Sequence, residues 1–557
     1  MNPAPIEVFG RPIGVLAPLL FILLTNTYVI WFLLSRKRDG GLSSLPTIGT
    51  RNELFSWSRA TLRSLVSTRD WAFEGYYKYS KSHTYYSIPS IDQGRVLVVP
   101  PRYIREVYSI TDKRLDVHDT GNKTLQAQWT IWNNNIYENS FNLDIVRNYI
   151  TRNLEIITPP LALELKYAFA REWGTTTTNW VEVRAWRSSL KIIAGVANAA
   201  FCGPPLCRNP AYLKWLGHHA TCLFIGSALI NCVPSPIKPL VGLTVAGVTH
   251  IAFRKAAKEC WPIVQERLKN TALLKENPDY NWVPPSDGLQ WIIEECYAKK
   301  DPKQLDTLGV CHRLIFLNDI SMYSTAITAQ NVILDLASSD PAFGYIEILR
   351  QECEAVLKEA GGSWTRQAVM KLKLVDSTIR ESMRLRPVFS LGSPRTVIDP
   401  QGVNVSQGGD KLYLPLGTRV ALPVEPIHHD ESIYKDATSF HPFRFANPDV
   451  IQSIFDNLAF ESDSPVTGGN HGQKAGVTLD DCFLGFGYGR SACPGRFFVM
   501  NEVKMFVAEM ILNYDLEYLR EGRSNLTPVI WLNVPLRDGK IRVRRRTGSH
   551  NEKSSNE

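Results

Sequence analysis

A ten-residue segment around a single cysteine restricts the fold of this chain more than any other feature. Residues 486–495 read FGYGRSACPG, and the sequence after them has helical spacing. Glycines allow a loop to approach a flat, bulky group without side-chain clash, and Pro494 suits the first turn of a helix, where no N–H is needed. Cys493 therefore lies just before a helix N-terminus, whose dipole and free N–H groups favour a thiolate able to bind a metal. The alternative for an isolated cysteine is a buried, unreactive thiol in a turn.

This segment resembles the haem-binding signature of the cytochrome P-450 family, and its continuation CPGRFF is similar to that of fungal members. The resemblance implies that Cys493 is the axial thiolate ligand of haem b, surrounded by Phe486, Gly489 and Arg490. One position departs from the family pattern. Where the family has an arginine or histidine that bonds a haem propionate, this chain has Ser491, so we expect that contact to be weaker or supplied from elsewhere.

The N-terminal region contains a long apolar stretch. Residues 13–34 carry no charge, and about 20 apolar residues suffice to cross the hydrocarbon layer of a membrane. Arg36-Lys37-Arg38 follow at once, which predicts a single-pass anchor in the endoplasmic reticulum with the body cytoplasmic. A cleaved signal peptide is the alternative, but the basic cluster is on the wrong side for one. Glycosylation triplets begin at Asn122, Asn404 and Asn525, and a cytoplasmic body would leave them unmodified.

The composition is that of a globular protein with a large core. The chain has 557 residues, 44% of them hydrophobic, and its net charge of +8 includes no basic block that would suggest nucleic acid. Its ten cysteines lack the close pairing of zinc sites, so we expect reduced thiols. The expected parts are a lumenal tail (1–12), the transmembrane anchor (13–34), a linker (35–50), one catalytic domain (51–545) and a disordered polar tail (546–557).

The resemblance implies a mainly α fold with small β-sheets, in which haem lies between a long central helix and the cysteine loop, behind an N-terminal transmembrane helix. Helical and strand patterns alternate with turns rich in glycine and proline. The expected elements include strands at 85–88 and 96–99, a helix over 129–164 broken at Pro159-Pro160, a long polar loop over 446–481 and a terminal hairpin over 531–543.

Residues 212–248 are unusually apolar. Pro234, Pro236 and Pro239 predict several short helices there, and His218, His219 and Lys238 interrupt the stretch, so we expect no second membrane span. In the cytochrome P-450 family this region roofs the substrate pocket, and an apolar roof suits a hydrophobic substrate that arrives from the membrane. Residues 202–209 (CGPPLCRN) resemble a segment of fungal members from terpenoid and alkaloid pathways.

Residues 309–337 predict a long helix that is apolar nearly all round and therefore buried. In the family a helix of this kind crosses the oxygen side of the haem, where an acid or histidine followed by a threonine supplies protons. Aligned on the downstream NVILDLA, this chain has Tyr323 at the acid position and Ser324 at the threonine position. A shift by one residue would give the alcohol role to Thr325. The alternative is that these hydroxyls bond helix carbonyls.

Glu381 and Arg384 are three residues apart, so both lie on one face of a helix predicted over 375–386. An isolated pair of this kind is commonly a surface salt bridge. Together with Arg444, in the downstream segment FHPFRF, the pair resembles the glutamate–arginine–arginine triad of the family. The triad is expected to lock this helix to the segment that leads to the cysteine loop.

Three further arginines are candidates for contacts with the haem edge. Arg395 matches the position from which the family bonds a haem propionate. Arg147 and Arg152 are candidates from the preceding half of the chain, with exposed helix charges as their alternative interpretation.

The resemblance covers nearly the whole chain and implies a haem-thiolate monooxygenase of fungal secondary metabolism. It would insert oxygen from O2 into a hydrophobic small molecule, expected to be a terpenoid, meroterpenoid or alkaloid intermediate. NADPH–cytochrome P-450 reductase, with cytochrome b5 as a further candidate, would donate electrons near Arg490 and Arg496. Because Tyr323, Ser324 and Ser491 depart from the family pattern, desaturation, rearrangement or dehydration without net oxygen insertion is the alternative. A membrane-anchored haem-binding protein without turnover is a third hypothesis.

Overall fold

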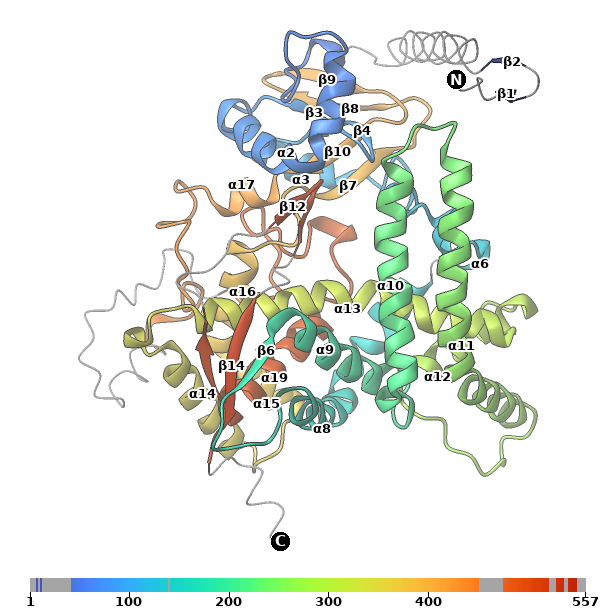
Figure 1. Cartoon of the computed structure of the whole chain (residues 1–557), viewed down its shortest axis with the longest axis vertical. Helices are drawn as coiled ribbons and strands as arrows, with labels where there is room; N and C mark the ends of the chain where they lie inside the picture. Colours follow the sequence, from blue (N-terminus) through green and yellow to red (C-terminus); the bar gives the residue numbers. More distant parts are fainter. Residues whose placement is uncertain are drawn as a thin grey trace, which may run out of the picture.

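Helices dominate the part of the chain that the structure describes (Figure 1). The computed structural model describes residues 42–138, 141–449, 474–519, 527–534 and 539–547, together with two backbone pairs at 7–8 and 11–12. The helices are α2 Ser56–Lys78, α3 Ile104–Ser109, α4 His118–Leu125, α5 Ala127–Thr130, α6 Asn134–Tyr137, α7 Asn142–Ile145, α8 Leu154–Trp173, α9 Ala185–Phe201, α10 Pro210–Asn231, α11 Lys238–Glu276, α12 Gly288–Ala298, α13 Thr307–Ala337, α14 Tyr345–Glu359, α15 Arg366–Lys371, α16 Lys373–Leu385, α17 Val424–His428 and α19 Arg496–Asn513.

Five small sheets accompany the helices in the described ranges. Their strands are β1 Glu7–Val8, β2 Arg11–Pro12, β3 Tyr86–Ser90, β4 Gly94–Val98, β5 Leu115–Asp116, β6 Val181–Arg184, β7 Gly392–Val397, β8 Val403–Gln407, β9 Asp410–Leu414, β10 Arg419–Leu422, β11 Tyr514–Tyr518, β12 Thr527–Val529, β13 Leu532–Val534 and β14 Lys540–Arg545. The largest sheet has the order β3-β4-β10-β7-β5, with β4 and β10 parallel. Tyr86 of β3 pairs with Val98 of β4 in antiparallel order, so the two strands predicted at 85–88 and 96–99 are confirmed.

The predicted hairpin over 531–543 is wrong. β13 pairs with β12, whereas β14 lies between β11 and β6 in a separate three-stranded sheet. In β14, Ile541 and Val543 are buried, and Ile541 lies opposite Val183 of β6. An alternating pattern shows which face of a strand is buried, but it does not show which strand lies alongside.

The predicted break at Pro159-Pro160 is also wrong. Both prolines lie inside α8, and the chain between residues 129 and 164 is interrupted earlier, between the short helices α5, α6 and α7. A proline removes the hydrogen bond to the carbonyl four residues before it. Those carbonyls belong to Glu155 and Ile156, which are exposed, as are the two prolines. Water can therefore satisfy both carbonyls, and the helix continues.

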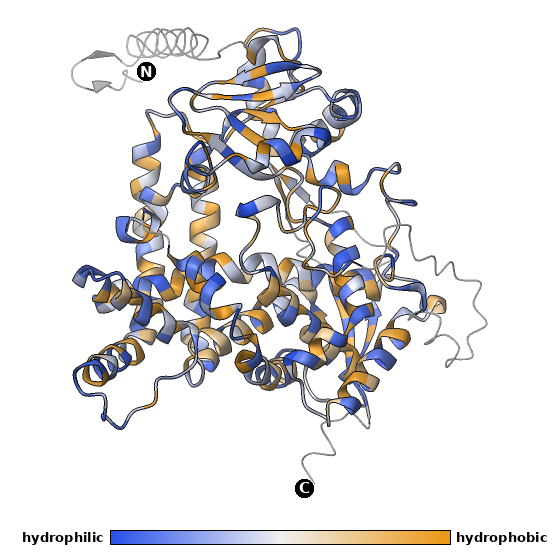
Figure 2. Cartoon of the chain, turned by 180° about the vertical axis from the view of Figure 1, so that it is seen from behind, coloured by the Kyte–Doolittle hydropathy of each residue, from blue (hydrophilic) through white to orange (hydrophobic). Residues whose placement is uncertain are grey.

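Two long helices, α10 and α11, stand side by side at one edge of the molecule (Figure 1). The prediction of several short helices over 212–248 is wrong, because Pro234 and Pro236 fall in the connection between two long ones. Pro239 lies in the first turn of α11, where its missing N–H removes no helical hydrogen bond. Figure 2 shows many hydrophobic residues along both helices, and several of them are exposed: Ile225, Leu229, Leu240, Leu243 and Ile251.

Several predictions fall on residues that lie outside the described ranges. These are the anchor at 13–34, most of the lumenal tail and linker, the polar tail from 548 onward, residues 450–473 of the long loop, and Asn525. Within the ranges that the structure describes, no helix combines the length and the apolar character needed to span a bilayer.

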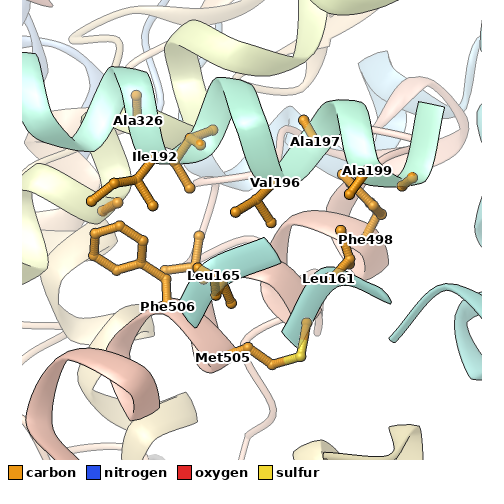
Figure 3. Packing of buried hydrophobic residues seen from close by; sticks show 14 of the residues in the cluster. Leu161, Leu165, Ile192, Val196, Ala197, Ala199, Ala326, Phe498, Met505 and Phe506 are labelled. Atoms are coloured by element: carbon orange, nitrogen blue, oxygen red, sulfur yellow. The ribbon is translucent and has the colours of Figure 1, made fainter. Parts of the chain in front are cut away.

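The central helix α13 includes the whole predicted span 309–337 and passes through the largest hydrophobic core. It begins where the Asp306 carboxylate accepts a hydrogen bond from the Gly309 N–H at 3.0 Å. Figure 3 shows α8, α9 and α19 packed together beside α13, through Leu161, Leu165, Ile192, Val196, Phe498, Phe506 and Ala326. This packing fixes α19, and with it the segment that precedes α19, relative to α13.

Candidate functional site

Close backbone approaches require glycine in the cysteine loop. The loop is closed by a hydrogen bond of 2.8 Å from the Cys493 N–H to the Phe486 carbonyl. Gly487 and Gly489 have φ angles of 77° and 69°, in the left-handed region that favours glycine. A Cβ atom at Gly489 would also lie 3.1 Å from the Tyr108 carbonyl oxygen. The loop therefore has the tight backbone that its sequence predicts.

The Cys493 side chain lies at the start of α19 and is partly exposed. Burial raises the pKa of its thiol, while the N–H groups of Gly495 and Arg496 and the Arg496 guanidinium lower it. These donors can stabilise a thiolate once a positive partner offsets the cost of burial. A cysteine that ligates haem iron needs this environment, so the residues present fit the cofactor.

Arg395 of β7 is a buried cation without a carboxylate partner in the described ranges. Its side chain is 2% exposed, and its guanidinium lies 4.3 Å from the centre of the Tyr108 ring. Two long hydrogen bonds, of 3.5 and 3.4 Å, reach the carbonyls of Tyr108 and Tyr488. Burial lowers the pKa of Arg395. An anionic group beside it would offset this cost, which fits the expected propionate contact.

The other residues expected near the haem edge are placed differently. Ser491 donates a hydrogen bond of 3.1 Å to an Asp112 carboxylate oxygen, so an exposed acid is its partner. Arg490, Arg147 and Arg152 are exposed. Among these candidates, Arg395 alone is a buried cation beside the cysteine loop.

The two candidate hydroxyls in the middle of α13 differ in their surroundings. The Thr325 hydroxyl is buried and donates to the Ser321 carbonyl at 2.8 Å, as the alternative interpretation anticipated. Ser324 is exposed, although most of its neighbours along the helix are buried. Ile320, one turn earlier, is also partly exposed. Ser324 is therefore the hydroxyl that water or a ligand can reach.

Tyr323 points toward α10. Its hydroxyl is hydrogen-bonded to the Thr221 hydroxyl, and its ring lies 5.8 Å from Trp186 and 5.4 Å from Phe224. These contacts hold the phenol within the interface between helices. The structure thus separates Tyr323 from Ser324, although the two are adjacent in the sequence.

A buried contact between a histidine and an aspartate, which sequence reasoning missed, lies one turn before Tyr323. His219 Nδ1 of α10 is 2.9 Å from a carboxylate oxygen of Asp319 of α13, and both residues are at most 1% exposed. Burial raises the pKa of Asp319, and His219 opposes that shift. The signal in the sequence was an acid inside an apolar helix, which requires a partner when buried.

The structure brings Glu381, Arg384 and Arg444 together in the buried interior. Glu381 Oε2 lies 2.8 Å from Arg384 Nε and 3.0 Å from Arg444 Nε. Burial alone would raise the pKa of Glu381, but the two guanidinium groups outweigh it and hold the pKa below its ordinary value. Arg384 also donates to the His428 carbonyl, and the His428 ring accepts the Leu484 N–H at 2.8 Å. The triad is therefore linked to the residues just before the cysteine loop.

These features together define a class of protein. A largely helical body, a cysteine whose backbone donors favour a thiolate, and a buried arginine suited to an anionic group are the arrangement of a haem-thiolate protein. The fold is similar to that of a retinoic acid-bound cyanobacterial CYP120A1, with a TM-score of 0.59 and 16% identity over 86% of this chain and 97% of that chain.

Comparison with known sequences identifies the family. The Cytochrome P450 family model matches residues 284–532. Over 540 residues, the chain is 39% identical to cytochrome P450 monooxygenase okaG of Penicillium ochrochloron, covering 96% of this chain and 100% of that relative. It is 31% identical over 506 residues to cytochrome P450 monooxygenase gloP of Glarea lozoyensis, covering 89% and 90%. The chain belongs to the cytochrome P450 family and is a haem-thiolate monooxygenase.

Proposed function

We propose that Cys493 is the iron ligand and that the enzyme inserts oxygen from O2 into a hydrophobic intermediate of fungal secondary metabolism. One observation carries this proposal: the Cys493 sulfur lies at the start of α19, where the N–H groups of Gly495 and Arg496 favour its thiolate. When bound, the haem supplies the oxygen-activating chemistry. The thiolate and the Arg395 guanidinium would hold the cofactor at two points, the second through a propionate.

The residues of α13 would manage water and protons on the substrate side. Ser324 has an accessible hydroxyl, and we assign it the task of holding a water molecule that would deliver the protons. Thr325 is occupied by the Ser321 carbonyl, and Tyr323 by Thr221, so we assign neither of them that task. Ile320, on the same side of the helix one turn away, would orient an apolar substrate and exclude water.

The substrate class is inferred from the apolar character of α10 and α11 and from the relatives. Exposed side chains such as Leu229, Leu240 and Leu243 favour access from a lipid phase. The sequence CGPPLCRN at 202–209 resembles fungal enzymes of terpenoid and alkaloid pathways. We therefore propose a terpenoid, meroterpenoid or alkaloid intermediate as the substrate.

The redox partner and the location follow from the same proposal. An anchor at 13–34 would place the enzyme in the endoplasmic reticulum membrane with its body cytoplasmic. NADPH–cytochrome P450 reductase would then deliver electrons from the cysteine side, with cytochrome b5 as a second candidate donor. The exposed Arg490 and the partly exposed Arg496 favour an acidic partner there.

The decisive experiment is turnover with isotopically labelled dioxygen. The full chain would be co-expressed with a reductase in microsomes, supplied with candidate terpenoid and alkaloid scaffolds, and its products examined by mass spectrometry. The proposal expects one labelled oxygen atom in the product. Because Tyr323 and Ser324 depart from the family pattern, desaturation, rearrangement or dehydration is the second candidate, and it expects a product without label. A haem-binding protein without turnover would show no NADPH-dependent loss of any bound scaffold.

A further inference from the structure

A cavity of about 190 Å³ lies between α15, α16 and α19, close to the start of α19. Phe497 and Met500 of α19 line one wall, and Met370 of α15 and Val477 contribute to the others. Phe497 lies in the first turn of α19, four residues after Cys493, so the cavity is close to the cysteine loop. Because Phe497, Met500, Met370 and Val477 all have apolar side chains, much of the cavity wall is apolar.

Cations outnumber acids in the lining. The charged residues that line the cavity are Arg366, Lys373, Lys474, Lys504 and Asp376. Asp376 is already engaged, with one carboxylate oxygen 2.6 Å from Lys504 Nζ and the other 2.5 Å from the Gly476 N–H. The ammonium of Lys474 has its own partner, Asp480, at 3.1 Å. These two ion pairs involve Lys504 and Lys474. Arg366 and Lys373 therefore carry the excess positive charge of the lining.

Arg366 is held in place by neutral groups. Its guanidinium donates to the Asn501 side-chain oxygen at 2.8 Å, and the Asn501 amide donates to the Thr158 hydroxyl at 3.2 Å. In the described ranges no carboxylate lies within ion-pair distance of Arg366. Burial lowers the pKa of both Arg366 and Lys504, against the opposing charge of Asp376 in both cases and of Glu352 for Lys504. An anion in the cavity would offset the cost of burying these cations.

We propose that this cavity binds a small organic carboxylate. The carboxylate group would lie against the guanidinium of Arg366, which suits it geometrically, and near the ammonium of Lys373, the other cation of the excess. The apolar part of the ligand would cover Phe497, Met500 and Met370. An inorganic anion would satisfy the charges but leave these apolar walls uncovered, so the lining favours an acid with an aromatic or aliphatic body. This site is separate from the substrate side and does not depend on which substrate is oxidised.

Binding should be measured on the full-length, haem-loaded protein by calorimetric titration with benzoate, using benzamide as the neutral isostere. Arg366→Gln removes charge without emptying the wall. Met370→Trp places a larger side chain in the lining of the cavity, and because Met370 is 52% exposed the fold can accept the substitution. Lys358→Gln, at an exposed position on α14, is the matched control.

Benzoate should bind to the unmodified protein, and benzamide should bind about tenfold more weakly because it cannot form the charge-assisted bonds. Arg366→Gln and Met370→Trp should each weaken benzoate binding by about tenfold or more, and Lys358→Gln should leave it unchanged. Absence of benzoate binding would overturn the proposal. So would an affinity unaffected by Met370→Trp, which would place benzoate elsewhere. If Arg366→Gln changed only the affinity for the reductase, the cations would serve to bind an acidic protein surface. That result would also refute the proposal.

Discussion

Ser324 and Thr325 are adjacent in α13, but Ser324 is exposed and Thr325 is buried. This difference can be tested. Ser324→Ala should uncouple NADPH consumption from product formation, because it removes the exposed hydroxyl proposed to hold a water molecule. Thr325→Val should retain coupling and lose about 1 kcal/mol of stability, the value of a typical buried hydrogen bond. The measurement is the ratio of product formed to NADPH consumed. Loss of coupling in Thr325→Val with Ser324→Ala unchanged would reverse the assignment.

The ligand role of Cys493 has a spectroscopic signature. Cys493→Ala should abolish the red-shifted Soret band that the ferrous carbon-monoxide adduct of a thiolate-ligated haem shows. Cys482→Ala is the matched control, because Cys482 is also partly exposed and lies before the cysteine loop. Retention of the band in Cys493→Ala would mean that another residue ligates the iron.

Part of the site could be predicted from the sequence because its residues lie in one contiguous motif. The glycines and Cys493 lie within ten residues, so their spacing alone predicted a tight loop before a helix. The pair of His219 and Asp319 could not be predicted in this way, because its members are 100 residues apart and meet only when α10 packs on α13. The different surroundings of Ser324 and Thr325 likewise depend on what covers α13, which helical periodicity does not specify.

At the scale of elements, the triad joins α16 to the chain before the cysteine loop. Glu381→Gln should destabilise the protein by about 3–5 kcal/mol, because it leaves two buried guanidinium groups with a neutral partner. The readouts are the thermal midpoint and the rate of haem loss from the folded protein. Glu354→Gln on the exposed side of α14 is the control and should change neither. A Glu381→Gln variant with wild-type stability would show that the triad adds nothing to the fold.

Elements were predicted well where the pattern is long and local, as in α13, α16 and α19. They were predicted poorly where the outcome depends on solvent or on distant partners. The prolines of α8 are tolerated because water can reach the carbonyls of Glu155 and Ile156. β14 pairs with β11 and β6, one of which precedes it by more than 300 residues. No local pattern contains that information.

For the whole molecule, buried acids make stability depend on pH. Burial raises the pKa of Glu509 in α19 from its ordinary value of 4.5 to about 7, against the opposing charges of Lys166 and Arg545. The unfolded chain releases this proton near pH 4.5 and the native chain near pH 7, so the contribution of Glu509 to stability falls as pH rises through that window. Two and a half pKa units correspond to about 3 kcal/mol.

Glu509→Gln should therefore leave the protein as stable as the wild type near pH 4.5 and make it progressively more stable than the wild type up to about pH 7. The thermal midpoint of the haem-loaded protein, measured across this range for both proteins, tests the prediction. A difference between the two that does not change with pH would contradict it.

The contact between His219 and Asp319 also has a mechanical consequence for α10. The end of α10 is a dozen residues beyond His219, or about 18 Å along the helix axis. With this contact as the pivot, a rotation of about 5° displaces that end by about 2 Å, and α11 would move with it because the two helices are packed side by side (Figure 1). A small tilt of α10 about this contact would therefore be amplified along the helix and would be largest at the end that leads into α11.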